Sequence, residues 1–303
     1  MCALLALWPR PGVAAAQSAP PAVGAQVATT DFFHVLLRSA QDGNASAQFE
    51  IGRAYETGEG VPRDYKEAVG WYRRAAAQDY PEGLRAMGVM SQFGLGIEQD
   101  FNAAIQWFLA AVEVGDPIAE NNLGVLYQRG NGVAQDYEQA AKWYRLSADH
   151  GHEGAKANLG ALYLDGHGVA EDAARGIELI REVAESGDEG AMYDLATAYK
   201  DGTGVAQNDG EALNWLRRAA QGGHPMAAHT LGQVYLNGDG VKSNRQEALL
   251  WFLVADARMP FNGHTAAERK EFARSTEALL RALPRDQIEA ASQRAKEVLS
   301  ALP

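Results

Sequence analysis

Cysteine is almost absent from this sequence, which contains only Cys2 in 303 residues. A single cysteine cannot form an intrachain disulfide, and it excludes a cysteine-rich zinc site. Long apolar runs are also missing, because no stretch approaches the roughly 18–20 residues that a membrane-spanning helix needs. Basic residues are in deficit, with 27 Lys and Arg against 39 Asp and Glu and a formal net charge of −12. Because nucleic-acid binding requires clustered basic side chains, this balance excludes a typical nucleic-acid binder.

Glycine is abundant by contrast, with 32 residues in a chain whose 47% apolar content is typical of a folded protein. The glycines recur with a period of 36 residues, which indicates a repeat architecture rather than the two domains that the length suggests. Six pairs, each followed by Val or Ile, are Gly58/Gly60, Gly94/Gly96, Gly130/Gly132, Gly166/Gly168, Gly202/Gly204 and Gly238/Gly240. A second glycine column is Gly52, Gly88, Gly124, Gly160 and Gly232, with Ala196 in the fifth copy.

One copy has the pattern of two helices joined by a tight turn. The first helix is predicted over residues 47–56, and Gly58 suits the left-handed conformation that ends a helix. The second helix is predicted to start after Asp64, in a column that is Asp or Asn in every copy and supplies an N-cap. Trp71 and Tyr72 then lie on a predicted buried face. Because one pair cannot bury this face alone, the sequence predicts an all-α fold, a solenoid of six stacked helix pairs.

The tryptophans follow the same period and are predicted to belong to the core. The column is Trp71, Trp107, Trp143, Trp215 and Trp251, with Leu179 in the fourth copy. Truncating a buried aromatic side chain to Ala typically costs about 3–5 kcal/mol of stability. We expect a loss of this size at each tryptophan of the column.

The chain ends differ from the repeats. Residues 1–29 are predicted to be a signal peptide and flexible lead-in, because Val13–Gln17 resembles a signal-peptidase site after Ala16. A disordered cytosolic tail is the alternative interpretation. Residues 30–46 are predicted to form an N-terminal capping helix, 47–262 the six repeats, and 263–303 the C-terminal capping helices. We therefore expect a periplasmic or secreted protein, with a cytoplasmic location as the alternative.

The third copy carries the fullest form of the pattern: Ala119, Leu123, Gly124, Tyr127, Gly130, Gly132, Val133, Asp136, Ala140, Trp143, Tyr144 and Ala148. This pattern resembles the Sel-one-like repeat, a close relative of the tetratricopeptide repeat, and the resemblance spans residues 47–262. It implies a right-handed α-solenoid superhelix that acts as an adaptor, often in bacterial cell-envelope signalling, assembly or host interaction. Such adaptors bind proteins rather than catalyse reactions, but a fold alone does not fix an activity.

The resemblance also implies that the first helix of each pair lines the concave side. Three columns of that helix, at positions i, i+4 and i+7, share one face and change chemistry from copy to copy. The residues predicted to bind a partner are Arg85, Asn121, Gln128, Tyr193, Thr197, Lys200, His229 and Gln233. Their mixed chemistry suits an extended peptide or a helix, and simple solvation of the face is the alternative.

The fourth copy is the most acidic. Between residues 155 and 190 it carries eight acidic and three basic residues, a net charge of −5. Such a cluster is either a docking patch for a basic segment of a partner or, more often, a solvated outer face.

No catalytic, cofactor-binding or metal-binding residues are predicted. The double-glycine turns lack the rest of a phosphate-binding loop, and no Gly-x-Ser-x-Gly or His-Glu-x-x-His sequence occurs. His150, His152 and nearby His167 are interpreted as turn residues rather than metal ligands. The sequence therefore favours a non-enzymatic scaffold that binds proteins or peptides, without nucleic acid, cofactor or membrane span. The alternative is a hydrolase or ligand-binding protein similar to cysteine-rich, β-lactam-binding repeat proteins, whose cysteines are missing here.

Overall fold

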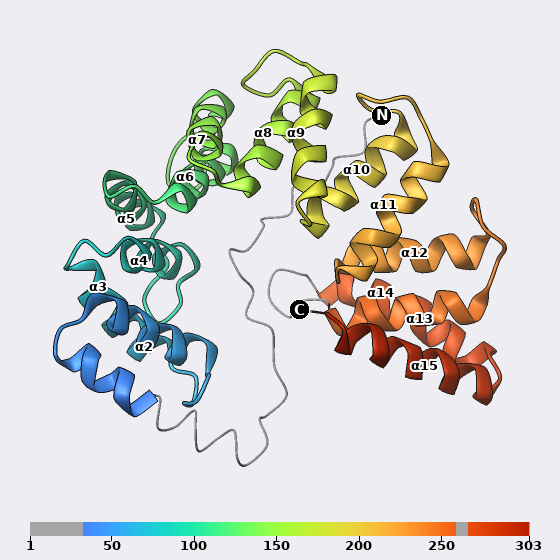
Figure 1. Cartoon of the computed structure of the whole chain (residues 1–303), viewed down its shortest axis with the longest axis horizontal. Coiled ribbons are helices and arrows are strands. Elements are labelled where there is room, and N and C mark those ends of the chain that lie inside the picture. Colours follow the sequence, from blue (N-terminus) through green and yellow to red (C-terminus); the bar gives the residue numbers. More distant parts are fainter. Residues whose placement is uncertain (1–32, 259–265, 303) are drawn as a thin grey trace. The chain divides into compact units, whose positions relative to one another are not determined.

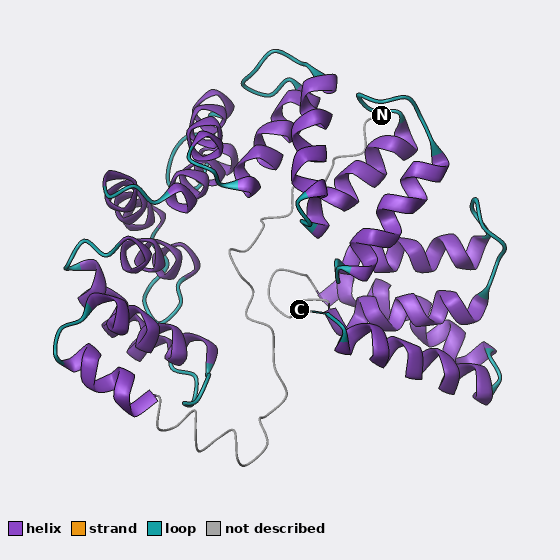
Figure 2. Ribbon diagram, in the orientation of Figure 1, coloured by secondary structure: helices purple, strands orange, loops and turns teal. Residues whose placement is uncertain are grey.

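The computed structural model describes residues 33–258 and 266–302, with side chains for all of these except 266–272. Helices are the only regular elements over these ranges (Figure 2). Residues 33–41 are helical, and the other described helices follow in pairs (Figure 1). The repeat pairs are α2 (Ala45–Thr57) with α3 (Tyr65–Ala76), α4 (Pro81–Phe93) with α5 (Phe101–Glu113), α6 (Pro117–Arg129) with α7 (Tyr137–Asp149), α8 (Glu153–Asp165) with α9 (Ala173–Glu185), α10 (Glu189–Asp201) with α11 (Asp209–Gln221), and α12 (Pro225–Asn237) with α13 (Arg245–Arg258). Two more helices, α14 (Ala266–Ala282) and α15 (Arg285–Ser300), follow them. The predicted leader, residues 1–29, lies outside the described residues.

The chain divides into two compact units. Within the described residues, the first unit comprises 33–158 and 167–169, and the second comprises 159–166, 170–258 and 266–302. In the first unit α2 packs on α3, α3 on α4, and so on to α7. In the second unit the same order runs from α9 to α13. This packing of each helix on the next along the chain is the α-solenoid architecture that the period of 36 predicts.

The polar and glycine columns set the helix ends. Asp64 accepts hydrogen bonds from the backbone N–H groups of Lys66 and Glu67 at 2.9 and 3.2 Å and caps α3. The Asp or Asn at this position caps the second helix of each other repeat in the same way. All twelve paired glycines have φ between 64° and 87°, a region in which other side chains are strained. Gly58 therefore ends α2 in the left-handed conformation that the sequence predicts.

The core lies between the two helices of a pair, where a ring fills the space that a glycine leaves. A Cβ at Gly52 of α2 would lie only 2.6 Å from two ring carbons of Tyr72 on α3. The same fit recurs in the pairs Gly88/Phe108, Gly124/Tyr144 and Gly232/Phe252. All four rings are at most 1% exposed. The glycine column is therefore required by this close approach of ring to backbone.

The tryptophan column is less buried than the sequence predicts. Three of its five members are 7% exposed, whereas Trp107 and Trp143 are only half-buried. The guanidinium of Arg74 lies 4.2 Å from the ring centroid of Trp71, over its outer face. The column one residue later, that of Tyr72, faces the glycine of the pair's first helix and forms the centre of the core. The expected uniform cost of tryptophan truncation is therefore wrong for the half-buried members, whose truncation removes less buried surface.

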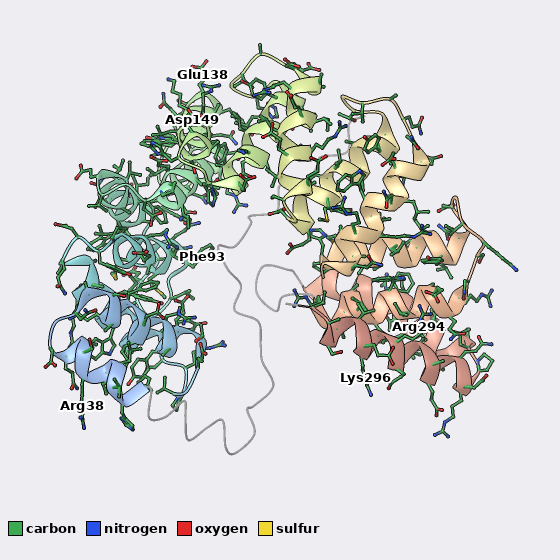
Figure 3. All side chains as sticks on the ribbon, viewed as in Figure 1. Arg38, Phe93, Glu138, Asp149, Arg294 and Lys296 are labelled. Carbon is green, nitrogen blue, oxygen red and sulfur yellow. The ribbon has the colours of Figure 1, made fainter. Side chains whose placement is uncertain are left out.

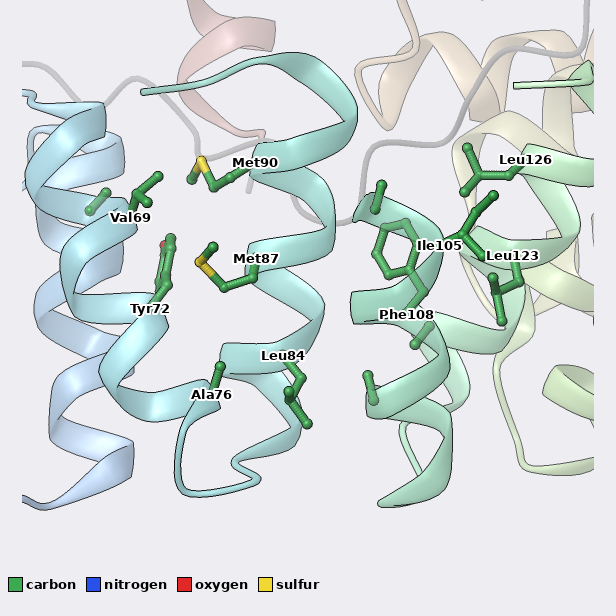
Figure 4. Close-up of a cluster of buried hydrophobic side chains, with 14 residues drawn as sticks. Val69, Tyr72, Ala76, Leu84, Met87, Met90, Ile105, Phe108, Leu123 and Leu126 are labelled. Atoms are coloured by element: carbon green, nitrogen blue, oxygen red, sulfur yellow. The ribbon is translucent and has the colours of Figure 1, made fainter. Parts of the chain in front are cut away.

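Successive repeats are joined by the second glycine of four of the six turns and by a shared apolar cluster. A Cβ at Gly96 would lie 2.3 Å from the carbonyl oxygen of Tyr65, in the first turn of the preceding repeat's second helix. A Cβ at Gly204 would lie equally close, 2.3 Å, to the carbonyl oxygen of Ala173. Figure 4 shows buried side chains such as Met87 filling the space between neighbouring helices from α3 to α6. The core is therefore continuous from one repeat to the next within this unit.

The last two helices pack on the end of the array. Both α14 and α15 contact α13. Thr276 of α14 donates a hydrogen bond to Asp256 of α13 at 2.7 Å. Burial raises the pKa of the Asp256 carboxyl above its usual value, and the Thr276 hydrogen bond opposes this shift. Arg294 of α15 forms an ion pair with Glu247 of α13.

Candidate partner-binding faces

The eight residues predicted to bind a partner all lie on the first helices of their pairs, but in different units. The N-terminal face, on α4 and α6 of the first unit, comprises Arg85, Asn121 and Gln128. The C-terminal face, on α10 and α12 of the second unit, comprises Tyr193, Thr197, Lys200, His229 and Gln233.

The first predicted column is occupied largely by contacts between repeats. Arg85 forms an ion pair with Asp116, the N-cap of α6, with Nε and Oδ2 2.8 Å apart. The side chain of Asp116 is 5% exposed and that of Arg85 is 22% exposed. The ring of Tyr193 stacks on His224, the N-cap of α12, at a centroid distance of 4.9 Å. Arg85 and Tyr193 thus each hold the residue that begins the next repeat's first helix, 31 positions later in the chain.

Asn121 and Gln128 of the N-terminal face are also held within the fold. Asn121 is 7% exposed and accepts a hydrogen bond from the side-chain amide of Asn158 at 2.8 Å. Gln128 accepts a hydrogen bond from the hydroxyl of Tyr144 at 2.5 Å. Burial raises the pKa of the Tyr144 phenol far above its usual value, which keeps it protonated as the donor. These two side chains contribute to the packing of repeats whether or not they contact a partner.

The C-terminal face is more open. Lys200 is exposed at the end of α10, and Gln233 is half-buried on α12. Thr197 donates a hydrogen bond to the backbone carbonyl one turn earlier at 3.1 Å. The ring of His229 lies 5.1 Å from that of Phe252, in the core of its own repeat. Lys200 and Gln233 are therefore the two residues of this face with the most freedom to contact another molecule.

An exposed aromatic residue of the first unit was not among the predicted residues. Phe93, labelled in Figure 3, ends α4 and is 55% exposed. Val89, one turn earlier, is half-buried, and Arg129 occupies the position equivalent to Phe93 in the next repeat and is exposed. The sequence signal was available, because the other repeats carry only polar residues at this position. Aromatic residues and arginine are enriched in protein interfaces.

The acidic fourth repeat presents its charge to solvent. Seven of its eight acidic residues are exposed, and Asp188 is half-buried. Asp172 and Asp188 cap α9 and α10, which explains two of the carboxylates without a partner molecule. Arg175 pairs with Glu178 at 2.5 Å. Binding of a basic segment here stays a prediction.

The histidines interpreted as turn residues have separate structural contacts. His150 approaches both carboxylate oxygens of Glu120, which is 2% exposed, at 2.9 and 3.0 Å. His152 accepts a hydrogen bond from the N–H of Ala155 and directly precedes α8. His167 stacks on Tyr137 at a centroid distance of 4.6 Å. Within the described part of the chain, no three side chains of the types that ligate metals gather at one place.

In the described ranges, no helix is long and apolar enough to cross a bilayer. The fold and its faces define the class of protein as an α-solenoid built from tandem helix pairs. A family model for the Sel1 repeat matches six times, over residues 45–80, 81–116, 117–152, 154–188, 190–224 and 225–255. The chain therefore belongs to the Sel1 repeat family. No curated protein matches this sequence.

Several solved structures share the fold. A Sel1 repeat protein from Oxalobacter formigenes is 34% identical with a TM-score of 0.66, and the match covers 76% of this chain and 100% of that one. A protective antigen present in uropathogenic Escherichia coli strains is 28% identical with a TM-score of 0.61, covering 88% of this chain and 64% of that one. An immunity protein from Pseudomonas aeruginosa is 18% identical with a TM-score of 0.50, covering 78% and 81%, which shows likeness of fold alone.

Proposed function

We propose that this chain is an exported, non-enzymatic scaffold of the bacterial cell envelope that binds a protein partner through the first helices of its repeats. Sel1 repeat proteins are generally scaffolds for protein interaction, and six such repeats make up most of this chain. The similar solved structures named above come from bacteria. The small-residue stretch Val13–Gln17 in the predicted leader supports export.

The observation that carries the proposal is the exposure of Phe93 at the end of α4, in the first unit. Phe93 is 55% exposed, so much of its apolar surface contacts water. Covering this surface with another molecule would be favourable, because apolar surface is then removed from water. Half-buried Val89 and exposed Arg129 supply apolar and cationic surface on α4 and α6. An exposed aromatic side chain with an arginine at the equivalent position of the next repeat has the composition of an interaction hot spot. Burying the Phe93 ring against a partner would therefore supply the apolar part of the binding energy.

Site-specific photo-crosslinking in living cells tests this proposal. A photo-reactive residue in place of Phe93 is expected to give one protein adduct of defined mass. The matched control replaces Leu146, which is 38% exposed on α7, the second helix of its pair. Phe93→Ala is expected to weaken binding of the identified partner by about tenfold or more, and Leu146→Ala to leave it unchanged. Equal adducts from both positions, or none from position 93, would refute partner binding through the surface of Phe93, Val89 and Arg129 on the first helices.

Export has its own test. Cell fractionation combined with mass spectrometry of the purified chain is expected to find a periplasmic or secreted form that begins after Ala16. A full-length chain confined to the cytosol would refute export and leave the binding proposal standing.

A further inference from the structure

The end of the array carries a groove of about 460 Å³ between its last helices. Gln233 and Leu236 of α12 lie on one side, and Arg274 and Leu279 of α14 lie on the other. Arg245, the first residue of α13, also lines the groove. Leu279 is 5% exposed, so the groove has an apolar floor. Its rim carries two exposed arginines.

The groove is open because the array lacks a covering turn at this point. At four earlier junctions, the second glycine of a turn packs against the first turn of the preceding repeat's second helix, as Gly96 does on Tyr65. Arg245 occupies the position of Tyr65 in the sixth repeat. After it, α14 joins α15 through residues 283–284, without a double-glycine turn. The first turn of α13 is therefore left without the segment that covers four of its five counterparts; at the fifth, a Cβ at Gly240 would meet nothing within 4 Å.

The two arginines at the rim differ from their neighbours in having no partner among the side chains that the structure describes. Neither Arg245 nor Arg274 forms an ion pair or a side-chain hydrogen bond with any described residue. Other arginines at this end of the chain are paired: Arg281 with Glu277 at 3.1 Å, Arg285 with Glu289 at 2.9 Å, and Arg294 with Glu247. A guanidinium offers planar, bidentate donors that match a carboxylate. The groove thus presents unused positive charge beside apolar surface, in a chain whose net charge is −12.

We propose that this groove binds an extended, acidic segment of a partner protein in the place of the missing turn. Carboxylates of the segment bind to Arg245 and Arg274, and an aliphatic side chain contacts Leu236 and Leu279. The amide of Gln233 is available to hydrogen-bond the segment's backbone. The inference rests on the proposed scaffold function and names the chemistry of a ligand for one end of the array.

A direct binding measurement on the full chain tests the groove. The probe is a short fluorescent peptide of alternating Asp and Leu residues, compared with a matched peptide that has Asn in place of Asp. Because the chain as a whole repels an acidic peptide, binding of the Asp peptide at low ionic strength requires a local positive site. Arg245→Glu with Arg274→Glu is expected to weaken its binding by about tenfold or more. The matched control, Arg281→Glu with Arg285→Glu, makes the same change in charge away from the groove.

Several outcomes would overturn the proposal. Equal binding of the Asp and Asn peptides, no binding of either, or an equal loss in the control variant would each do so. Concentration-dependent self-association abolished by Arg245→Glu and Arg274→Glu would show that a second copy occupies the groove instead. Failure of peptide binding with the position-93 adduct intact would refute only the groove. Loss of the position-93 adduct with peptide binding intact would refute only partner binding through the surface around Phe93. Circular dichroism of both double variants checks that they remain folded.

Discussion

Substitution of Gly124 by Ala tests the fit between ring and glycine that fixes the helix pair. The new Cβ would lie 2.5 Å from Cε1 and 2.6 Å from Cδ1 of Tyr144, well inside the 3.4 Å at which ordinary contact begins. Overpacking of a rigid core costs about 1–3 kcal/mol. A displaced ring also weakens the hydroxyl's hydrogen bond to Gln128, which adds about 1 kcal/mol. Alanine's better helix propensity returns about 1 kcal/mol, so the net loss is about 1–3 kcal/mol.

Urea denaturation followed by circular dichroism measures this loss. The control is Gly70→Ala on α3, because Gly70 is exposed and an added Cβ there meets nothing within 4 Å. This control is expected to gain about 0.5–1 kcal/mol of stability. The two glycine-to-alanine substitutions should therefore have opposite signs.

A double-mutant cycle isolates the contact itself. The fifth repeat carries Ala196 and Leu216 at the positions of Gly124 and Tyr144. In a Tyr144→Leu background, Gly124→Ala should cost at least about 1 kcal/mol less than in the wild type. The reasoning is refuted if Gly124→Ala stabilises the protein as Gly70→Ala does, or if its cost is the same in both backgrounds.

Three further substitutions are predicted from the same structure. Tyr144→Ala should lower the free energy of unfolding by about 3–5 kcal/mol, clearly more than Trp143→Ala, because the tyrosine is fully buried and the tryptophan half-buried. Urea titrations that rank the two variants in the opposite order would contradict this. Asp136→Ala should lose about 1 kcal/mol of stability through the α7 N-cap, whereas Asp136→Asn should lose little; equal losses would exclude capping as the cause. Burial raises the pKa of Asp256 in the folded state above its unfolded-state pKa. Ionisation of this carboxyl therefore lowers the free energy of unfolding as pH rises through the folded-state pKa. Below the unfolded-state pKa the carboxyl is protonated in both states, and this loss of stability is absent. Asp256→Asn, which can still accept from Thr276, should therefore stabilise the protein relative to wild type more at pH 7 than at pH 3 in thermal melts, and a gain independent of pH would contradict the shift.

The fold could be predicted from the sequence because each repeated column has one dominant physical cause. The left-handed turn at Gly58 and the N-cap at Asp64 each satisfy a local backbone requirement, so spacing alone located the helix ends within two residues. The balance of burial between Trp143 and Tyr144 was not predictable in this way. Both residues lie on the apolar side of their helix, and only the approach of Gly124 selects which ring is enclosed.

The binding residues were harder to predict, because a column can vary for two different reasons. A side chain changes from repeat to repeat if it contacts a partner, but also if it contacts a neighbouring repeat that varies with it. Arg85 belongs to the second kind, since its ion pair with Asp116 joins one repeat to the next. Complementary chemistry at a spacing of 31 was the signal for this contact. The polar residues at the position of Phe93 in the other repeats were the sequence signal that it is exposed, and the burial of Met87 and Met90 orients α4 in agreement with it.

The contacts at a spacing of 31 have a consequence for how such an array evolves. Their members fall within a single match to the repeat: Phe49 with Tyr80 in 45–80, Arg85 with Asp116 in 81–116. Main-chain contacts that cross from one match to the next, such as Gly96 on Tyr65, use a glycine that every copy shares. Side-chain contacts also cross, between Asn121 and Asn158 and between Tyr137 and His167. Duplication or loss of one whole copy therefore keeps the contacts at a spacing of 31 together, but it changes the partners of the side chains that cross between matches.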